Sequence, residues 1–312
     1  MPDTRQHNPH ARNHSRYRAL ASSCAAVVAL TAAGAATSAN AHADPGSCPT
    51  ATATATTFTA PTVPFLDWAE NLGYDTQGNL WVSRLYRNEV QRYDTTGHIT
   101  ATVPVTSPGA IRLGPDHLLY VVYGDNSLNM LPGARNGGVV RFDPAAPTLT
   151  PEVFIGGLTM PNGAAFDPAG NLYIADTASG VIRVRRDGTV DTDWTAQATL
   201  FGVNGLAIQG DSLYTTVYLA PDGRILQIPI ATPARSHTTL DLPLADDLTS
   251  APDGFLYVAT TSGTLLRVDP TRRTICTLLS TGPLAAVVPI PDTLDLMVTT
   301  GSGDILRVHP SD

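Results

Sequence analysis

Lysine is absent from this 312-residue chain, and all 19 of its basic residues are arginine. The 27 acidic residues give a formal net charge of −8. Setting aside Asp3 and the four arginines among the first 18 residues leaves 26 acidic and 15 basic residues, a net charge of −11. A chain this acidic has no electrostatic attraction for nucleic acid or an anionic membrane surface. We expect a small-molecule substrate and a monomeric protein.

Several signals of other folds and chemistries are also missing. No segment keeps a helical apolar period over ten or more residues, which argues against a helical fold. The sequence contains no Gly-x-Ser-x-Gly elbow and no phosphate-binding loop. The histidines beyond the N-terminal region fall in expected turns or on outer and terminal segments (His98, His117, His237 and His309), so histidine catalysis is not expected.

The N-terminal region has the order of a secretory signal peptide. A basic start containing Arg5 and Arg12 is followed by an apolar, Ala-rich stretch over residues 19–36 and by Ala41-His42-Ala43. This order predicts a signal peptide over residues 1–43 and an exported chain that starts near Asp44, with no membrane attachment after cleavage. A membrane anchor is the alternative, but the stretch is weakly apolar and ends in a cleavage-type sequence.

Short apolar runs bounded by Gly, Pro and Asp recur at intervals near 40 residues. Residues 160–184 show the pattern best, with three runs separated by Asp-Pro-Ala-Gly and by Thr-Ala-Ser-Gly. Six such units predict an all-β fold, a six-bladed β-propeller formed by residues 44–312 as one domain. The sixth unit lacks one strand, and an unattached β-segment lies at residues 56–65. We expect this segment to close the ring as the outer strand of the last blade, which removes an exposed edge.

Four of the six units carry an oxygen-bearing side chain at the same place, just before the innermost strand. These residues are Glu70, Asn162, Asn204 and Asp246, while Pro108 and Leu284 are assigned to the other two units. Two carboxylates and two carboxamides that converge on one axis form the ligand set of a hard cation. We expect one divalent cation, Ca²⁺ first, with Mg²⁺, Mn²⁺ or Zn²⁺ as alternatives. Each Asn-Gly could instead serve only a turn.

These four positions, with the Pro-Asn-Gly-Ala-Ala-Phe and Asn-Gly-Leu-Ala-Ile phrases, resemble the regucalcin/gluconolactonase (senescence marker protein) family over roughly residues 66–308. The resemblance implies that Glu70, Asn162, Asn204 and Asp246 are the metal ligands and that the substrate is a lactone. Two features depart from the family: Asp247 stands where Gly is usual, and the sixth unit offers no His near the channel. The repeat also resembles NHL units, for which no metal is implied.

The sequence therefore leads to an exported, metal-dependent hydrolase of a lactone or related cyclic ester. The cation would polarise the carbonyl and activate water, with Asp246 as base and Asp176 and Asp125 as further candidates. Arg84, Tyr123 and Tyr218 lie in equivalent loops and are candidate substrate-binding residues. The alternatives are a non-catalytic NHL-like binding propeller and a metal-dependent cyclase or isomerase.

Cysteine is scarce, and only Cys48 and Cys276 follow the signal peptide. An isolated pair in an exported protein predicts a disulfide, and two unpaired buried thiols are the alternative. We expect the exported protein to show no titratable thiol under denaturing conditions. Its intact mass should correspond to a chain that begins near Asp44. Reduction should lower the free energy of unfolding by roughly 2–5 kcal/mol, because the bridge closes a long loop. Two titratable thiols per chain would rule the bridge out.

Overall fold

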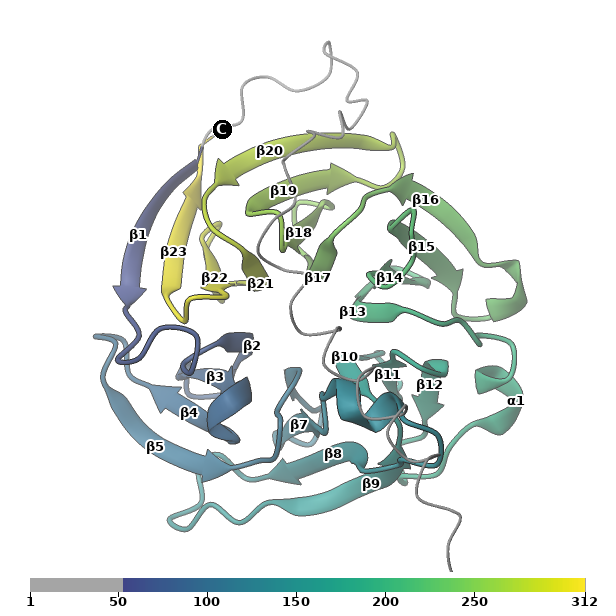
Figure 1. Ribbon diagram of the computed structural model, residues 1–312, viewed down its shortest axis with the longest axis horizontal. Coiled ribbons are helices and arrows are strands. Elements are labelled where there is room, and N and C mark those ends of the chain that lie inside the picture. Colours follow the sequence, from purple (N-terminus) through teal and green to yellow (C-terminus); the bar gives the residue numbers. More distant parts are fainter. Residues whose placement is uncertain (1–52, 312) are drawn as a thin grey trace, which may run out of the picture. The chain divides into compact units, whose positions relative to one another are not determined.

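The computed structural model describes residues 53–311, so the expected signal peptide and Cys48 lie outside the described residues. All described residues belong to one unit of the chain. Their strands form six antiparallel sheets arranged as blades around a central axis (Figure 1). The expected all-β, six-bladed propeller is thereby confirmed.

Within the first five blades, the strands run from the axis outward in chain order. The first blade contains β2 (Ala69–Tyr74), β3 (Leu80–Arg84), β4 (Glu89–Tyr93) and β5 (Ile99–Pro104). The second contains β6 (Ile111–Leu113), β7 (Leu119–Tyr123), β8 (Gly137–Phe142) and β9 (Glu152–Leu158). The third contains β10 (Pro161–Phe166), β11 (Leu172–Asp176) and β12 (Gly180–Val184). The fourth contains β13 (Val203–Gln209), β14 (Ser212–Val217), β15 (Arg224–Pro229) and β16 (His237–Asp241). The fifth contains β17 (Ala245–Ser250), β18 (Leu256–Thr260), β19 (Thr264–Asp269) and β20 (Thr274–Ser280).

A repeated aspartate forms the turn between the first two strands of a blade. In the third blade, Asp167 accepts hydrogen bonds from the Asn171 backbone N–H at 2.8 Å and from the Tyr173 hydroxyl at 3.0 Å. Asp75 does the same in the first blade, where the Trp81 indole N–H replaces the tyrosine at 2.9 Å. Gly170, with φ +84°, supplies the left-handed residue that this turn requires. The Asp-Pro-Ala-Gly sequence therefore forms a single hydrogen-bonded turn.

The apolar residues of the described chain pack into six clusters, one for each interface between neighbouring blades. The cluster between the first and second blades is centred on Trp81, whose ring contacts Phe142 edge-on at 5.3 Å. The cluster between the third and fourth blades contains Tyr173 and Trp194. Each blade is thus apolar on both faces, and its strands are buried because a neighbour covers each side.

The third blade has three strands, and its outer side is covered by the segment that contains α1 (Thr192–Thr195). The Val181 N–H donates to the Ala198 carbonyl at 3.0 Å, and the Asp191 N–H donates to the Arg183 carbonyl at 2.8 Å. The edge of β12 is therefore not left unpaired. Three short 3₁₀ turns lie in loops: η1 (Leu85–Arg87), η2 (Ser127–Met130) and η3 (Pro233–Arg235).

The sixth blade combines both ends of the described chain. It contains β21 (Leu284–Pro289), β22 (Leu296–Thr300), β23 (Ile305–Pro310) and, outermost, β1 (Ala53–Thr59). β1 pairs antiparallel with β23, from Ala53 opposite Pro310 to Thr59 opposite Ile305, which confirms the expected closure (Figure 1). The bounds expected for this strand, residues 56–65, are wrong: prolines at 61 and 64 have no N–H to donate to a ladder, and the chain turns there.

Cys276 lies buried in β20, at the outside of the fifth blade. Its expected bridge to Cys48 stays a prediction, because Cys48 falls outside the described residues. Among residues 53–311, no helix is long and apolar enough to cross a membrane.

Deleting β1 should expose the edge of β23 and leave the sixth blade with three strands. We expect the truncated protein to aggregate or misfold, since an unpaired edge pairs with other chains. Size-exclusion chromatography and thermal melting of the purified protein, with and without residues 53–59, would measure aggregation and stability. A monomeric truncated protein with an unchanged melting temperature would show that the ring does not depend on this pairing.

Candidate functional site

The second residue of the innermost strand is polar in four blades. Glu70, Asn162, Asn204 and Asp246 occupy this position in β2, β10, β13 and β17. In each of these strands the pairing register shifts directly around that residue. The side chains of all four line one pocket where the innermost strands converge, around the axis of the ring (Figure 1). The sequence prediction thus correctly identified four residues that share a site.

The register corrects the assignment for the remaining two blades. Leu284 pairs with Thr300, as Ala245 pairs with Thr260 in the fifth blade, so the equivalent of Asp246 is Ala285 and not Leu284. In the second blade Ile111 pairs with Val121, which makes Gly109, and not Pro108, the equivalent position. A Cβ at Gly109 would lie 2.8 Å from the Asn162 carbonyl oxygen, so this position cannot carry a side chain without displacement.

Asp125, from the loop after β7, supplies a third carboxyl group to this pocket. The Asn162 side-chain N–H₂ donates to Glu70 at 3.0 Å and to Asp125 at 2.9 Å. The Trp68 indole N–H donates to the other Glu70 oxygen at 2.6 Å. Glu70 is therefore held between two donors from different blades.

Asn204 and Asp246 lie with these residues in the same pocket, and we call the five residues together the cage: Glu70, Asp125, Asn162, Asn204 and Asp246. The Asn204 side-chain nitrogen donates to Asp246 at 2.8 Å. The Asn204 Oδ1 atom is buried and has no hydrogen-bond partner among the described residues. A buried acceptor without a donor is costly, so the Asn204 oxygen is suited to contact a positive or hydrogen-bearing group.

The pKa shifts of the carboxyl groups also indicate that the pocket suits a positively charged group. Burial, and then the charge of Glu70, raise the pKa of both Asp125 and Asp246, and burial raises the pKa of Glu70. No Lys, Arg or His belongs to the described residues that line the pocket. Three buried carboxyl groups without a cationic partner favour either protonation or a bound cation.

A buried ion pair lies next to this cage. Asp247 accepts a hydrogen bond from Asn71 at 2.9 Å and lies 3.8 Å from the Arg112 guanidinium. Arg112 also donates to the Asn71 side-chain oxygen at 2.9 Å. Burial raises the pKa of Asp247 to about 6, although Arg112 opposes this shift. Arg112 thus pairs with Asp247, and nothing in the sequence except the unusual Asp at 247 indicates this pairing.

The pocket has a volume of about 300 Å³ and a mixed lining. The polar residues beyond the cage are Ser107, Asn126, Ser127, Thr177 and Thr261. The apolar and aromatic residues are Trp68, Leu85, Tyr86, Met160, Tyr218 and Leu219. Of the residues expected to bind substrate, Tyr218 lies here, with its hydroxyl 3.3 Å from the Thr261 hydroxyl.

Three other candidates do not line this pocket. The buried Asp176 carboxylate accepts backbone N–H groups from Thr159 at 2.7 Å and Ala178 at 3.1 Å, so it holds two loops. Arg84 is buried and donates to the carbonyls of Asp67 at 2.6 Å and Gly303 at 2.8 Å, which joins the first and sixth blades.

Tyr123, the third of these candidates, packs against glycines of the outer strands. Its hydroxyl lies 2.6 Å from the position that a Cβ would take at Gly138 and 3.2 Å from that at Gly156. Arg84 and Tyr123 were expected in loops, but they are the last residues of β3 and β7, and the sequence does not reveal in which direction such side chains point.

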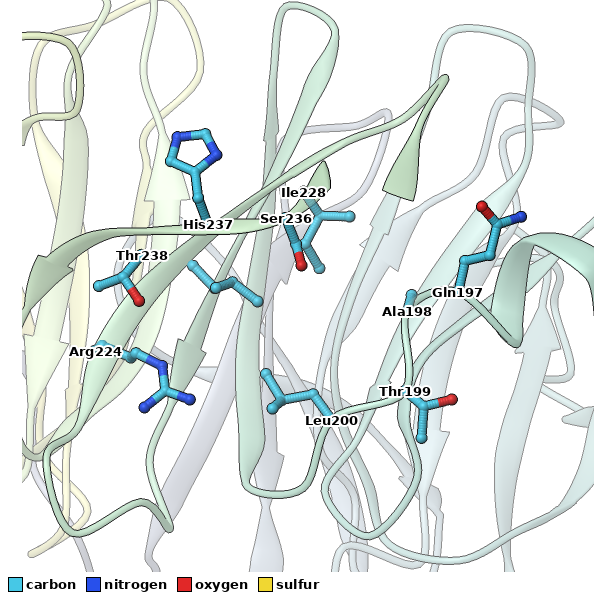
Figure 2. Close-up of a pocket in the computed structure, with 10 residues that line it drawn as sticks. Gln197, Ala198, Thr199, Leu200, Arg224, Ile228, Ser236, His237 and Thr238 are labelled. Atoms are coloured by element: carbon cyan, nitrogen blue, oxygen red, sulfur yellow. The ribbon is translucent and has the colours of Figure 1, made fainter. Parts of the chain in front are cut away.

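A second pocket, of about 280 Å³, lies between the third and fourth blades (Figure 2). It is lined by the segment after α1 and by residues of β15 and β16, including Arg224 and His237. Figure 2 shows His237 pointing away from Leu200 at the base of this pocket. No Asp or Glu lines it, so it lacks the paired acid and base groups of the axial site.

Solved gluconolactonase-like and regucalcin-like propellers share this fold. A gluconolactonase from Xanthomonas campestris matches with a TM-score of 0.68 at 16% identity, over 83% of this chain and 90% of that chain. The calcium-binding protein regucalcin from Agrobacterium tumefaciens matches with a TM-score of 0.62 at 17% identity, over 81% and 92%. A streptogramin B lyase matches with a TM-score of 0.56 at 12% identity, over 83% and 98%. No protein-family model matches the chain, and no curated protein is a significant match to its sequence.

The buried carboxyl groups predict how stability depends on pH. An acid whose pKa is higher in the folded protein binds its proton more tightly there, so its stabilisation is full at low pH and is lost as pH rises through the folded pKa. The melting temperature of metal-free protein should therefore rise as pH falls from about 7.5 to about 5, as Glu70, Asp125, Asp246 and Asp247 take up protons.

Glu70→Gln should flatten this dependence, and Asp187→Asn, in an exposed turn, should leave it unchanged. Acids with a lowered pKa, such as Asp295, act in the opposite direction only below about pH 4. Differential scanning calorimetry after exhaustive chelation measures the effect. A melting temperature of the parent protein that falls steadily over this range would contradict it.

Proposed function

We propose that this protein is a metal-dependent hydrolase that opens a lactone or a related cyclic ester in its axial pocket. The observation that carries the proposal is the placement of Glu70, Asn162, Asn204 and Asp246 at equivalent positions of four blades. The buried Asn204 side-chain oxygen among them has no hydrogen-bond partner within residues 53–311. The similarity to a gluconolactonase supports the substrate class, and the similarity to the calcium-binding protein regucalcin supports the cation.

The residues present fit a hard divalent cation. Two carboxylates balance a charge of 2+, and two amides add neutral oxygens, as calcium sites require. Each amide carries both a donor nitrogen and an acceptor oxygen, so the same side chain can bridge carboxyl groups or coordinate a cation. Within residues 53–311, no group of three or more His, Cys, Asp and Glu is arranged to hold a metal ion. The proposed ligand set differs from such groups because half of it is amide.

The cation, when bound, would draw electrons from the substrate carbonyl and make a nearby water more acidic. Asp125 lies in the pocket but outside the four equivalent positions, and its raised pKa is closer to neutral pH than that of an ordinary aspartate. We therefore assign the proton transfer to Asp125 in place of Asp176. Water adds to the carbonyl carbon as Asp125 takes its proton, the ring C–O bond breaks, and the proton passes to the ring oxygen. The product is a hydroxy acid. Asp246, the base expected from sequence, serves as a ligand in this scheme.

Asn162 and Trp68 prepare the site for this step. Both donate to Glu70, from the third blade and from the segment before β2, and so fix its carboxylate before substrate arrives. Such pre-orientation lowers the barrier because the groups need not reorganise during the reaction. Export through the signal peptide and a monomeric state complete the proposal.

Glu70→Ala and Asp246→Ala should each remove the metal and abolish lactone hydrolysis, because each deletes one of the two charged ligands. Asn162→Asp should keep the metal, since it preserves the oxygen and adds charge. Elemental analysis and a lactone hydrolysis panel, with and without chelator, are the measurements.

Asp187→Ala, an exposed carboxylate outside the pocket, is the matched control and should retain both properties. Full metal content and full turnover in both Glu70→Ala and Asp246→Ala would show the site assignment to be wrong. Metal binding without hydrolysis of any lactone would favour a binding propeller instead.

A further inference from the structure

The lining of the axial pocket is apolar on two opposite sides, which we call the wall. Trp68, Leu85 and Tyr86 come from the first blade, while Tyr218 and Leu219 come from the fourth, which faces it across a six-bladed ring. The Trp68 and Tyr86 rings meet edge-on, with centroids 6.2 Å apart. The pocket therefore combines two apolar sides with the carboxyl and amide groups of the cage.

Part of this wall is left open to solvent. Tyr86 is 57% exposed and Leu219 is 40% exposed, although both belong to the lining of one concave site. Exposed apolar groups that gather around a polar centre are typical of ligand pockets, where the ligand covers them. A substituent of the substrate would remove this area from water, at about 25 cal/mol for each Å².

Part of the polar rim is committed to the protein. The Thr177 hydroxyl donates to the Val203 carbonyl at 2.9 Å, and the Asn126 side-chain oxygen accepts the Leu128 N–H at 2.9 Å. The hydroxyls of Tyr218 and Thr261 lie 3.3 Å apart and pair with each other. Beyond the hydroxyls of Ser107 and Ser127, a polyhydroxylated ring would find few partners on the rim, and its hydroxyls against the apolar sides would lose hydration without a partner, which weakens binding.

The charges around the pocket also restrict the kind of substrate that it can bind. No cationic side chain lines the described pocket, and Arg112 is taken by Asp247. An anionic substituent would approach Glu70, Asp125 and Asp246 without a counter-charge of the protein's own, so the substrate is neutral outside its reacting ester.

We propose that the pocket takes an uncharged lactone that carries an alkyl or aryl substituent, in preference to a sugar lactone. This inference rests on the proposed function for the reaction, but it concerns the wall and not the cage. The ester would meet the cage, and the substituent would lie between Tyr86 and Leu219.

The test compares three substrates with the calcium-loaded protein in a pH-stat: δ-decalactone, dihydrocoumarin and D-glucono-δ-lactone. We expect kcat/KM for the first two to exceed that for the sugar lactone by at least about tenfold, since burying even two methylenes supplies this factor. An equal or higher kcat/KM for the sugar lactone would overturn the inference while leaving lactone hydrolysis intact.

A binding measurement separates this inference from the proposed reaction. Calorimetric titration with an alkyl-substituted δ-lactam and with a polyhydroxylated δ-lactam, neither of which is opened, reports the preference of the wall alone. Tighter binding of the alkyl lactam supports the inference even if no lactone is hydrolysed, and tighter binding of the polyhydroxylated one overturns it.

Two variants locate the effect. Leu219→Ser should raise KM for δ-decalactone about fivefold or more and should reduce the ratio of kcat/KM for δ-decalactone to that for the sugar lactone. Leu128→Ser is the matched control, because Leu128 is also exposed, at 67%, but does not line the pocket. Equal effects of the two substitutions, or no effect of Leu219→Ser, would overturn the placement of the substituent.

Discussion

Repulsion among Glu70, Asp125 and Asp246 is the constraint on which the centre of this ring depends. Each carboxyl group is buried, and the charge of Glu70 raises the pKa of both aspartates. The amides of Asn162 and Asn204 offset part of this repulsion by donating to the acids. The rest of the blade packing holds the acids in place, so a favourable centre requires protons or a cation. Stability and function therefore draw on the same few side chains.

The fold could be inferred from the sequence because its signals are local. An aspartate that bonds a following backbone N–H and an aromatic side chain recurs from blade to blade, so the repeat length is visible without any knowledge of distant contacts. The closure by an N-terminal strand followed from counting strands. Its bounds were wrong because an unpaired segment has no partner in the sequence from which to read a register.

The site was only partly predictable. Equivalent positions in repeats identify Glu70, Asn162, Asn204 and Asp246 because the register shift turns the same strand position toward the axis each time. Residues at the far ends of the second strands follow no such rule. Asp176 ends β11 and Asp125 lies two residues beyond β7, yet Asp125 lies in the cage and Asp176 bonds to backbone. Pro108 and Leu284 were each assigned one residue too early, because only the strand pairing shows that Gly109 and Ala285 are the equivalent positions.

The pairing of β1 with β23 also sets an order of events during synthesis. β1 lies near the start of the described chain and β23 at its end, so β1 is made before five complete blades and waits for its partner until the last strand has left the ribosome. Contacts between such distant residues form late and slowly. The ring therefore cannot close around an incomplete circle of blades.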